Sequence, residues 1–267
     1  MDGLQALLLA LIQGLTEFLP VSSSAHLILP SQLLGWPDQG LAFDVAVHAG
    51  TLVAVMVYYR ESLTSLVMGV LGSGDNVSLR RREVSALLIA TLPAVVIGIA
   101  FSDAIDQYLR GIGVIATTTL LFGLLLGVSY SYRAAGADEQ PISRLDHALV
   151  IGLAQALALI PGTSRSGVTI TASLFLGYNL ATSARFSFLM SIPVIAGALL
   201  LLLVKEFELF FSSANLTLTL IAMLVAAVSA YATIAFFVGL VTRVGMMPFV
   251  IYRVLLALIL FSILVFE

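Results

Sequence analysis

Two short stretches place polar and charged side chains inside long apolar runs. In the first, LIQGLTEFLPVSSSAHL (residues 11–27), Gln13 and Glu17 are followed by a proline, three serines and His26. Gln13 and Glu17 are four residues apart and share one face of a helix. A carboxylate near the middle of a bilayer costs about 2.5–3.5 kcal/mol and normally marks a pathway or a site. A hydroxyl beside such a carboxylate is a candidate nucleophile.

The second stretch, IPGTSRSG (residues 160–167), repeats the hydroxyl cluster and adds a positive charge. Arg165 carries a planar fork of N–H groups that suits two-point contact with phosphate oxygens. A helix that starts at either cluster would also present free N–H groups and the positive end of its dipole, which bind phosphate. The predicted phosphate-binding hydroxyls are Ser22, Ser24, Thr163, Ser164, Ser166 and Thr169.

Each of these residues also has a structural explanation. Serine is a favoured N-cap residue, so one serine in each cluster could simply start a helix. Glu17 could be solvated at the mouth of a hairpin, or could form an ion pair with Arg165. His26, three residues after Ser23 on the same helical face, is either a general acid or base or a structural side chain.

The composition predicts the solvent around these residues. Hydrophobic residues make up 60% of the 267 residues and charged residues only 10%, whereas soluble domains carry about 25%. The chain has no cysteine, which excludes disulfides and thiolate chemistry. Its net charge of −3 and the lack of a basic stripe argue against nucleic acid. We therefore expect an all-α, polytopic membrane protein.

Apolar length predicts six transmembrane helices in a single integral membrane domain, 1–267. Two further apolar segments are interrupted by a proline with serine or glycine. Irregular backbone survives in lipid only where protein or a water-filled cavity satisfies its polar groups. We therefore expect these two segments to be re-entrant hairpins. The expected spans are 41–59, 84–102, 113–131, 185–204, 217–240 and 247–266, and the expected hairpins are 4–34 and 148–178.

The positions of the basic residues predict an orientation. With this topology, four loops gather on one side, which the positive-inside rule makes cytoplasmic. These loops hold Arg60, Arg80, Arg81, Arg82, Arg133, Arg144, Arg185 and Arg243, and the other side holds only Arg110 and Lys205. Both termini and the opening of the first hairpin would then be extracytoplasmic.

The same topology makes the two halves of the chain inverted copies of each other. The repeats are 1–131 and 148–267, joined by a cytoplasmic loop, 132–147. The breaks PVSSSAH and PGTSRSG align weakly, which places Ser23 beside Ser164. Inverted-repeat membrane proteins hold their sites where the repeats meet.

Three other intramembrane polar residues receive a structural interpretation. Asp44 and His48 form an i, i+4 pair that either lines the cavity or lies near the outer interface, and we favour the interface. Arg253 lies in the last span, where the neighbouring Tyr252 helps it reach an interface.

The stretches QGLTEFLPVSSSAH and PGTSRSG resemble the signature regions of the undecaprenyl-diphosphate phosphatases, also called bacitracin-resistance proteins. The similarity covers essentially the whole chain, including TLPAVVIGIAF (91–101) and MPFVIYR (247–253). The resemblance implies a membrane enzyme that hydrolyses undecaprenyl diphosphate to the monophosphate and phosphate. Such an enzyme lies in the cytoplasmic (inner) membrane of a bacterium, recycles the lipid carrier of cell-wall synthesis and confers bacitracin resistance.

The resemblance also implies roles for single residues and a cofactor. In the family, the residue that matches Ser23 is proposed as the nucleophile, and those matching Glu17 and Arg165 are essential. The family needs a divalent cation such as Mg²⁺ or Ca²⁺, and its [E/Q]xxxE element falls on Gln13 and Glu17. Because Gln13 brings no charge, it would be a weak ligand beside Glu17.

These residues together predict a mechanism. Ser23 would attack the terminal phosphorus while Glu17 or His26 takes its proton. Arg165, the two helix N-termini and a cation would stabilise the developing charge, and water would then hydrolyse a phosphoserine. In the alternative, Glu17 holds an attacking water and Ser23 is only a ligand.

A second class of function fits the same residues. A secondary transporter or flippase of a lipid phosphate also has inverted repeats, re-entrant hairpins and a midplane anion site. The expected partners are the lipid substrate and the bilayer, with no nucleic acid and with a homodimer as a candidate assembly.

Overall fold

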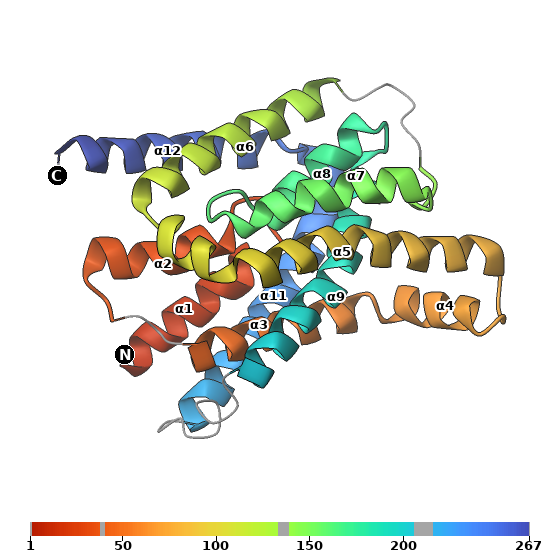
Figure 1. Ribbon diagram of the computed structural model, residues 1–267, viewed down its shortest axis with the longest axis horizontal. Helices are drawn as coiled ribbons and strands as arrows, with labels where there is room; N and C mark the ends of the chain where they lie inside the picture. Colours follow the sequence, from red (N-terminus) through yellow and green to blue (C-terminus); the bar gives the residue numbers. More distant parts are fainter. Residues whose placement is uncertain (1, 38–40, 133–138, 206–215, 267) are drawn as a thin grey trace.

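The computed structural model describes residues 2–37, 41–132, 139–205 and 216–266. In these ranges every regular element is a helix, so the expected all-α class is confirmed. The elements, shown in Figure 1, are α1 (Gly3–Thr16), α2 (Ser23–Leu34), α3 (Leu41–Tyr58), α4 (Arg60–Val70), α5 (Val77–Tyr108), α6 (Ile112–Tyr132), α7 (Leu145–Ala156), the 3₁₀ helix η1 (Leu157–Leu159), α8 (Arg165–Phe175), α9 (Leu180–Lys205), α11 (Leu216–Val244) and α12 (Met247–Phe266).

Five of these helices, α5, α6, α9, α11 and α12, are long and apolar enough to cross a membrane. Along α5, the large apolar side chains of Leu88, Leu92, Val96 and Ile99 are more than half exposed. An apolar outer surface of this kind fits lipid rather than water. The chain is therefore a multi-pass membrane protein.

The sixth expected span, 41–59, corresponds to α3. Its described apolar part, Phe43–Tyr58, is shorter than the other five helices and than the roughly 20 residues that a bilayer core requires. The count of six transmembrane helices therefore stays a prediction.

The region 60–83, expected as a loop, contains helix α4. Gly69 lets α4 lie directly on α5, because a Cβ atom there would stand 2.3 Å from Cβ of Arg80. Helix α4 has 11 residues and is shorter than a transmembrane span, so apolar runs of span length do not reveal it. Of the basic residues expected in these loops, Arg133 lies outside the described residues.

Both interrupted segments form pairs of short helices. Figure 1 shows α1 and α2 beginning and ending at the left end of the bundle, where both chain termini also lie. Helices α7 and α8 begin and end at the opposite end, so the two pairs meet in the middle from opposite directions.

Small residues let each pair pack deep in the bundle. A Cβ atom at Gly14 of α1 would stand 2.6 Å from the carbonyl oxygen of Ala226 in α11. A Cβ atom at Gly152 of α7 would stand 2.6 Å from the carbonyl oxygen of Ala90 in α5. Such backbone-to-backbone approach is typical of membrane helices. It brings α1 against α11 and α7 against α5.

Candidate active site

The first break contains the predicted carboxylate and hydroxyls. Glu17 ends α1 as its C-cap, and Ser22 is the N-cap of α2. Ser22 has a φ of 74°, which is rare for a residue with a side chain, and its Oγ accepts from the Ala25 N–H at 3.5 Å. This turn directs Ser23, the first residue of α2, back toward Glu17.

The second break has the same local geometry. Ser164, the N-cap of α8, has a φ of 70°, and its Oγ accepts from the Gly167 N–H at 3.2 Å. Each cap oxygen also contacts the hydroxyl two residues later, at 3.1 Å for Ser24 and 3.3 Å for Ser166. The two breaks are therefore built alike.

This equivalence corrects the predicted alignment by one residue. The caps Ser22 and Ser164 correspond, so Ser23 corresponds to Arg165 and not to Ser164. Gln13 and Gln155 then stand nine residues before their respective caps. The one-residue error arose because the prolines of the two breaks were matched.

The two breaks are bonded directly to each other. The Gly162 N–H donates to Ser22 Oγ at 3.2 Å, and Ser166 Oγ donates to the Leu19 carbonyl at 2.9 Å. The hydroxyls of Ser22 and Ser166 are thus used to join the breaks.

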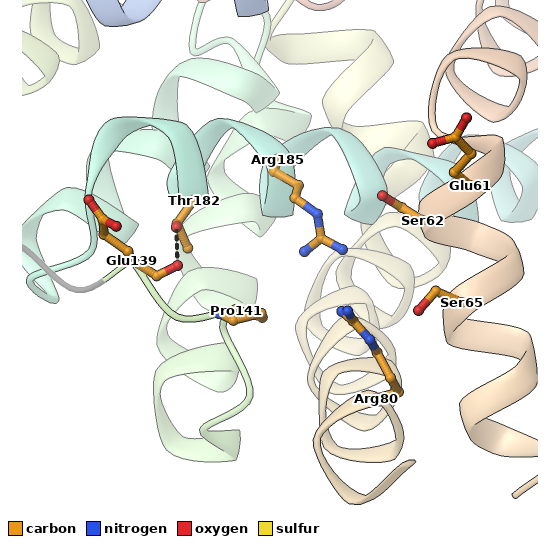
Figure 2. Close-up of a pocket in the computed structure, with 8 residues that line it drawn as sticks. All are labelled: Glu61, Ser62, Ser65, Arg80, Glu139, Pro141, Thr182 and Arg185. Atoms are coloured by element: carbon orange, nitrogen blue, oxygen red, sulfur yellow. Dashed lines mark hydrogen bonds between the residues drawn. The ribbon is translucent and has the colours of Figure 1, made fainter. Parts of the chain in front are cut away.

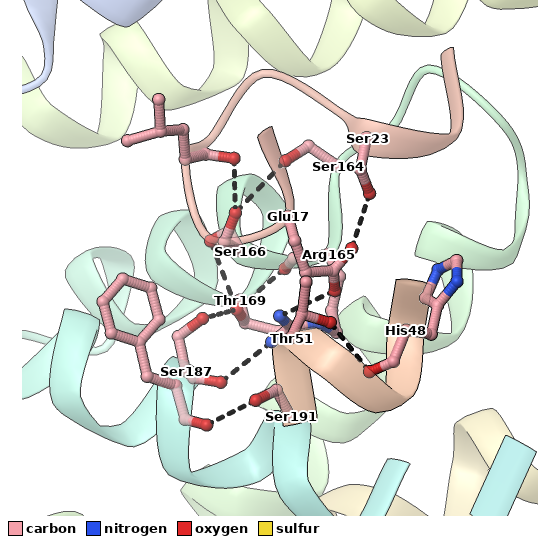
Figure 3. A network of polar contacts seen from close by, with 12 residues as sticks. Glu17, Ser23, His48, Thr51, Ser164, Arg165, Ser166, Thr169, Ser187 and Ser191 are labelled. Carbon is pink, nitrogen blue, oxygen red and sulfur yellow. Dashed lines mark hydrogen bonds and ion pairs between the residues drawn. The ribbon is translucent and has the colours of Figure 1, made fainter. Parts of the chain in front are cut away.

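Glu17 is the centre of the site (Figure 3). Its carboxylate is 9% exposed. Oε2 accepts from Ser23 Oγ at 2.6 Å and from Gln13 Nε2 at 3.0 Å, and Oε1 accepts from Arg165 Nη2 at 3.3 Å. The predicted nucleophile, carboxylate and arginine therefore lie together.

Arg165 is held on three sides. Its Nη1 donates to the Ser187 carbonyl in α9 at 3.0 Å, and its guanidinium carbon lies 5.8 Å from the centre of the Phe18 ring. Arg165 Nε is buried and has no hydrogen-bond partner among the described residues. The Arg165 side chain is therefore fixed in position, and its Nε–H group remains available as a donor.

The N-termini of α2 and α8 add further donors. The backbone N–H groups of Ser23, Ser24, Arg165 and Ser166 have no partner in the described part of the chain. These are the first-turn groups that every helix leaves unpaired. Two helix starts that meet in this way fit an anion with several oxygens.

The remaining predicted hydroxyls have different surroundings. Ser24 is exposed, whereas Thr163 is fully buried and its hydroxyl has no partner among the described residues. Thr169 Oγ1 lies 2.8 Å from the Arg165 carbonyl and 2.8 Å from Ser187 Oγ. Thr169 therefore ties α8 to α9.

His26 lies next to the site but is bonded elsewhere. Its Nδ1 is 2.7 Å from the Ser22 carbonyl, so Nδ1 carries the proton. In the neutral ring, Nε2 then accepts from the Tyr252 hydroxyl at 2.5 Å. With both nitrogens engaged, the ring makes no hydrogen bond to Ser23 or Glu17.

Arg253 is the functional residue that the sequence interpretation placed wrongly. Its side chain is fully buried instead of reaching an interface. It donates to the carbonyl oxygens of Pro20 at 3.2 Å, Gly162 at 2.8 Å and Thr163 at 3.0 Å. A fourth bond goes from Nε to the Thr119 carbonyl of α6 at 3.1 Å. Arg253 therefore joins both breaks to α6 and α12.

Two glycines make room for Arg253 and were the signal for its position. A Cβ atom at Gly123 would stand 2.9 Å from Arg253 Cβ, and one at Gly167 would stand 2.9 Å from Nη1. Glycines facing a charged residue from two different helices indicate a buried rather than an interfacial guanidinium.

His48 also differs from its interpretation as part of an interface pair. Its Nδ1 bonds the backbone carbonyl of Asp44 at 2.7 Å, and its ring lies within electrostatic range of Glu17. Figure 3 shows it beside the network, held on α3 with Thr51. His48 is thus a neighbour of the carboxylate that sequence spacing did not reveal.

In the described part of the site, one carboxylate, of Glu17, and one amide oxygen, of Gln13, are the candidate cation ligands. Gln13 Oε1 is buried and has no partner among the described residues, and the other end of the same amide bonds Glu17. No group of three or more His, Cys, Asp or Glu side chains forms in the described ranges. Mg²⁺ is commonly held by one or two carboxylates together with substrate phosphates. Glu17 and Gln13 fit that kind of site.

The fold and the site define a class of protein: a multi-pass membrane protein in which a serine and an arginine contact a buried carboxylate where two broken helix pairs meet. Residues 6–259 match the family model described as "Bacitracin resistance protein BacA". The chain belongs to this family.

Curated relatives match over nearly their whole length. The chain is 57% identical over 265 residues to the undecaprenyl-diphosphatase of Alcanivorax borkumensis, covering 96% of this chain and 97% of the relative. It is 52% identical over 267 residues to that of Teredinibacter turnerae, covering 98% and 99%. It is 49% identical over 268 residues to that of Saccharophagus degradans, covering 98% of each.

Proposed function

We infer that the chain is a membrane phosphatase that hydrolyses undecaprenyl diphosphate to undecaprenyl phosphate and phosphate. The family and the names of its relatives support this function. The observation that carries the chemistry is the 2.6 Å hydrogen bond from Ser23 Oγ to Glu17 Oε2. Hydrolysis of this lipid returns the carrier for cell-wall synthesis and gives bacitracin resistance.

In the proposed first step, Ser23 Oγ attacks the terminal phosphorus in line with the bridging oxygen. Glu17 Oε2 accepts the hydroxyl proton as the Oγ–P bond forms. The bond from phosphorus to the bridging oxygen breaks, and undecaprenyl phosphate leaves. Ser23 then carries the phosphoryl group.

Glu17 then releases this proton to the departing undecaprenyl phosphate, and in the second step the ionised carboxylate takes a proton from a water that attacks the phosphoserine. The Oγ–P bond breaks, phosphate leaves, and Ser23 recovers a proton. Direct attack by a water held on Glu17 is the competing route, in which Ser23 only binds phosphate. The short Ser23–Glu17 bond favours the serine route because it already points the hydroxyl proton at its acceptor.

Charge stabilisation comes from two sources at fixed positions. Arg165 stands on the opposite oxygen of Glu17 with its Nε–H unspent. The free N–H groups at the starts of α2 and α8 face the same region, and donors fixed before the reaction cost no reorganisation. Of the predicted hydroxyls, Thr163 is the one without a partner in the described chain and would add a contact with phosphate, whereas Ser24 Oγ already contacts Ser22 Oγ.

His26 is proposed to position the start of α2 rather than to act as base. Its two bonds, to Ser22 and Tyr252, connect that helix start to α12. A divalent cation, Mg²⁺ or Ca²⁺, would be held by Glu17 and Gln13 Oε1 with the substrate oxygens. When bound, it would neutralise part of the diphosphate charge.

The membrane arrangement follows from helix directions and charge. We propose that α1–α2 and α7–α8 are re-entrant hairpins in two inverted repeats, because they enter the bundle from opposite ends (Figure 1). The arginine-rich end is assigned to the cytoplasm of a bacterial inner membrane. The first hairpin then opens to the extracytoplasmic side. Assembly as a homodimer stays a prediction, which cross-linking in membranes would test.

The activity is tested with purified protein in detergent. Phosphate release from farnesyl diphosphate, a short-chain analogue, is expected with Mg²⁺ or Ca²⁺ and is expected to stop with EDTA. No release with any divalent cation would favour the transporter alternative, although none of the three relatives described above is named as a transporter.

A further inference from the structure

A polar cavity lies apart from the catalytic centre, since Glu17, Ser23 and Arg165 are not among its lining residues. It has a volume of about 390 Å³, is open to the outside, and is lined by α4, α5, α9 and the segment that precedes α7. It lies at the end of the bundle opposite the chain termini, where α5 and α9 begin (Figure 1). This is the end that the arginine distribution assigns to the cytoplasm.

Two arginines face each other across this cavity (Figure 2). Arg80 Nη1 donates to Glu83 Oε2 at 3.0 Å, and Arg185 Nη1 donates to the other oxygen of the same carboxylate. The Glu83 side chain is fully buried, whereas about a quarter of each arginine side chain is exposed. One carboxylate therefore holds two guanidinium groups, so this triad carries a net charge of +1.

Most of the donors on these two arginines are unspent. A guanidinium has five N–H groups, and each arginine uses one of its nitrogens on Glu83. Among the described residues neither has another hydrogen-bond partner. The hydroxyls of Ser62 and Ser65, on the α4 wall, also have no partner in the described chain. The cavity wall thus carries arginine N–H groups and serine hydroxyls whose donors are not used by other described residues.

The carboxylates on the cavity lining lie at its sides. Glu61 is 90% exposed and pairs with Arg60 at 3.6 Å. Glu139 lies on the opposite side in Figure 2, and its backbone oxygen accepts from Thr182 at 3.1 Å. The carboxylates of Glu61 and Glu139 therefore lie on either side of the space between Arg80 and Arg185 and not within it.

We propose that this cavity is a second phosphate-binding site, which takes the phosphate group of a soluble anion or of a lipid headgroup. Forked arginine donors and nearby hydroxyls match the geometry of phosphate oxygens. An ion triad that only tied α5 to α9 would need Glu83 but would not need the unspent donors or the free serines.

The site is separate from the catalytic centre. A row of three buried rings runs from the surroundings of Arg185 to those of Arg165. The rings are those of Tyr59, Phe188 and Phe18. Ring centroids are 6.3 Å apart for Tyr59 and Phe188 and 5.4 Å apart for Phe188 and Phe18. A ligand in the cavity does not touch Glu17 or Ser23, so the proposal does not depend on the catalytic mechanism.

The test compares two acidic substitutions on α4. Ser65→Asp adds a negative charge inside the cavity without removing Arg80, Glu83 or Arg185. Thr64→Asp adds the same charge at the neighbouring exposed position, outside the cavity lining. Equilibrium dialysis with labelled inorganic phosphate measures the amount bound per chain. Phosphate release from farnesyl diphosphate shows that both variants are folded, and neither residue belongs to the catalytic site.

Ser65→Asp is expected to bind one phosphate per chain fewer than Thr64→Asp and the unmodified protein. If Ser65→Asp bound as much phosphate per chain as Thr64→Asp and the unmodified protein, the proposal would be overturned. Competition with phosphatidylglycerol in mixed micelles separates the two sources of phosphate. Displacement by this lipid would assign the site to a headgroup, and no displacement would assign it to soluble phosphate.

Discussion

Ser23 and Arg165 occupy equivalent first positions of α2 and α8, and both reach the same carboxylate. Ser23 Oγ lies 2.6 Å from one oxygen of Glu17, and Arg165 Nη2 lies 3.3 Å from the other. Two similar breaks thus supply different chemistry from the same local position: the first supplies a hydroxyl and the second a guanidinium group. The buried carboxylate of Glu17 accepts a hydrogen bond from each. It therefore polarises the Ser23 hydroxyl while Arg165 balances its negative charge.

The replacement Arg165→Lys tests the need for a fork. A lysine keeps the charge but cannot bond Glu17 and the Ser187 carbonyl while also presenting a further planar donor to phosphate. We expect kcat for farnesyl diphosphate to fall at least about 100-fold, the usual cost of losing one preorganised donor to a developing oxyanion. Steady-state kinetics with a melting curve separates this effect from misfolding. A kcat within about tenfold of the unmodified protein would refute the role of the fork.

The replacement Arg253→Met tests whether this residue joins the two breaks. Methionine fills similar space but leaves the carbonyls of Pro20, Gly162 and Thr163 without their donor. We expect a loss of about 3 kcal/mol or more, since buried acceptors would lack partners. A thermal melt in detergent should show a clearly lower Tm. The control is Arg243→Met at an exposed position, which should melt like the unmodified protein. Equal melting of the two variants would contradict the account.

Comparison of His26→Asn with Glu17→Gln distinguishes the proton acceptor. The imidazole is bonded to Ser22 and Tyr252, whereas Glu17 accepts the Ser23 proton. Glu17→Gln should lower kcat by about 10²–10⁴, the range for loss of a general base. His26→Asn should lower it by no more than about tenfold, because only packing of the helix start changes. Equal losses would return His26 to the role of base.

The absence of native cysteine allows a direct test of orientation. Ser73→Cys, in the exposed turn after α4, should resist a membrane-impermeant maleimide applied to intact cells. Asp103→Cys, in the exposed last turns of α5, should react with it. Both should react after the cells are permeabilised. The reverse pattern of labelling would place the arginine-rich end outside and invert the proposed topology.

Much of the fold could be predicted because apolar length and breaks are local properties. The expected spans 113–131 and 247–266 differ from α6 and α12 by at most one residue at either end. The two interrupted segments do break at their serine clusters, and Glu17, Ser23 and Arg165 do come together. Intramembrane charge is costly enough to reveal such residues by type alone.

The errors concern contacts between distant parts of the chain. Arg253 bonds carbonyls of two breaks that lie about 90 and 230 residues earlier, and its own neighbours in sequence do not indicate this. The alignment of the breaks was shifted by one because the prolines were matched, although the cap geometry sets the true correspondence. Helix α4 and the place of His48 near Glu17 also depend on packing.

The nucleophilic role of Ser23 is tested most directly by a pair of single substitutions in one turn. Ser23→Ala removes the hydroxyl that donates to Glu17, and Ser24→Ala removes the exposed hydroxyl that follows it. Phosphate release from farnesyl diphosphate should fall more than about 100-fold for Ser23→Ala and less than about tenfold for Ser24→Ala. Incubation of the unmodified protein with substrate and an acid quench should trap phosphate on Ser23. If Ser23→Ala turned over within about tenfold of the unmodified protein, water and not Ser23 would be the nucleophile.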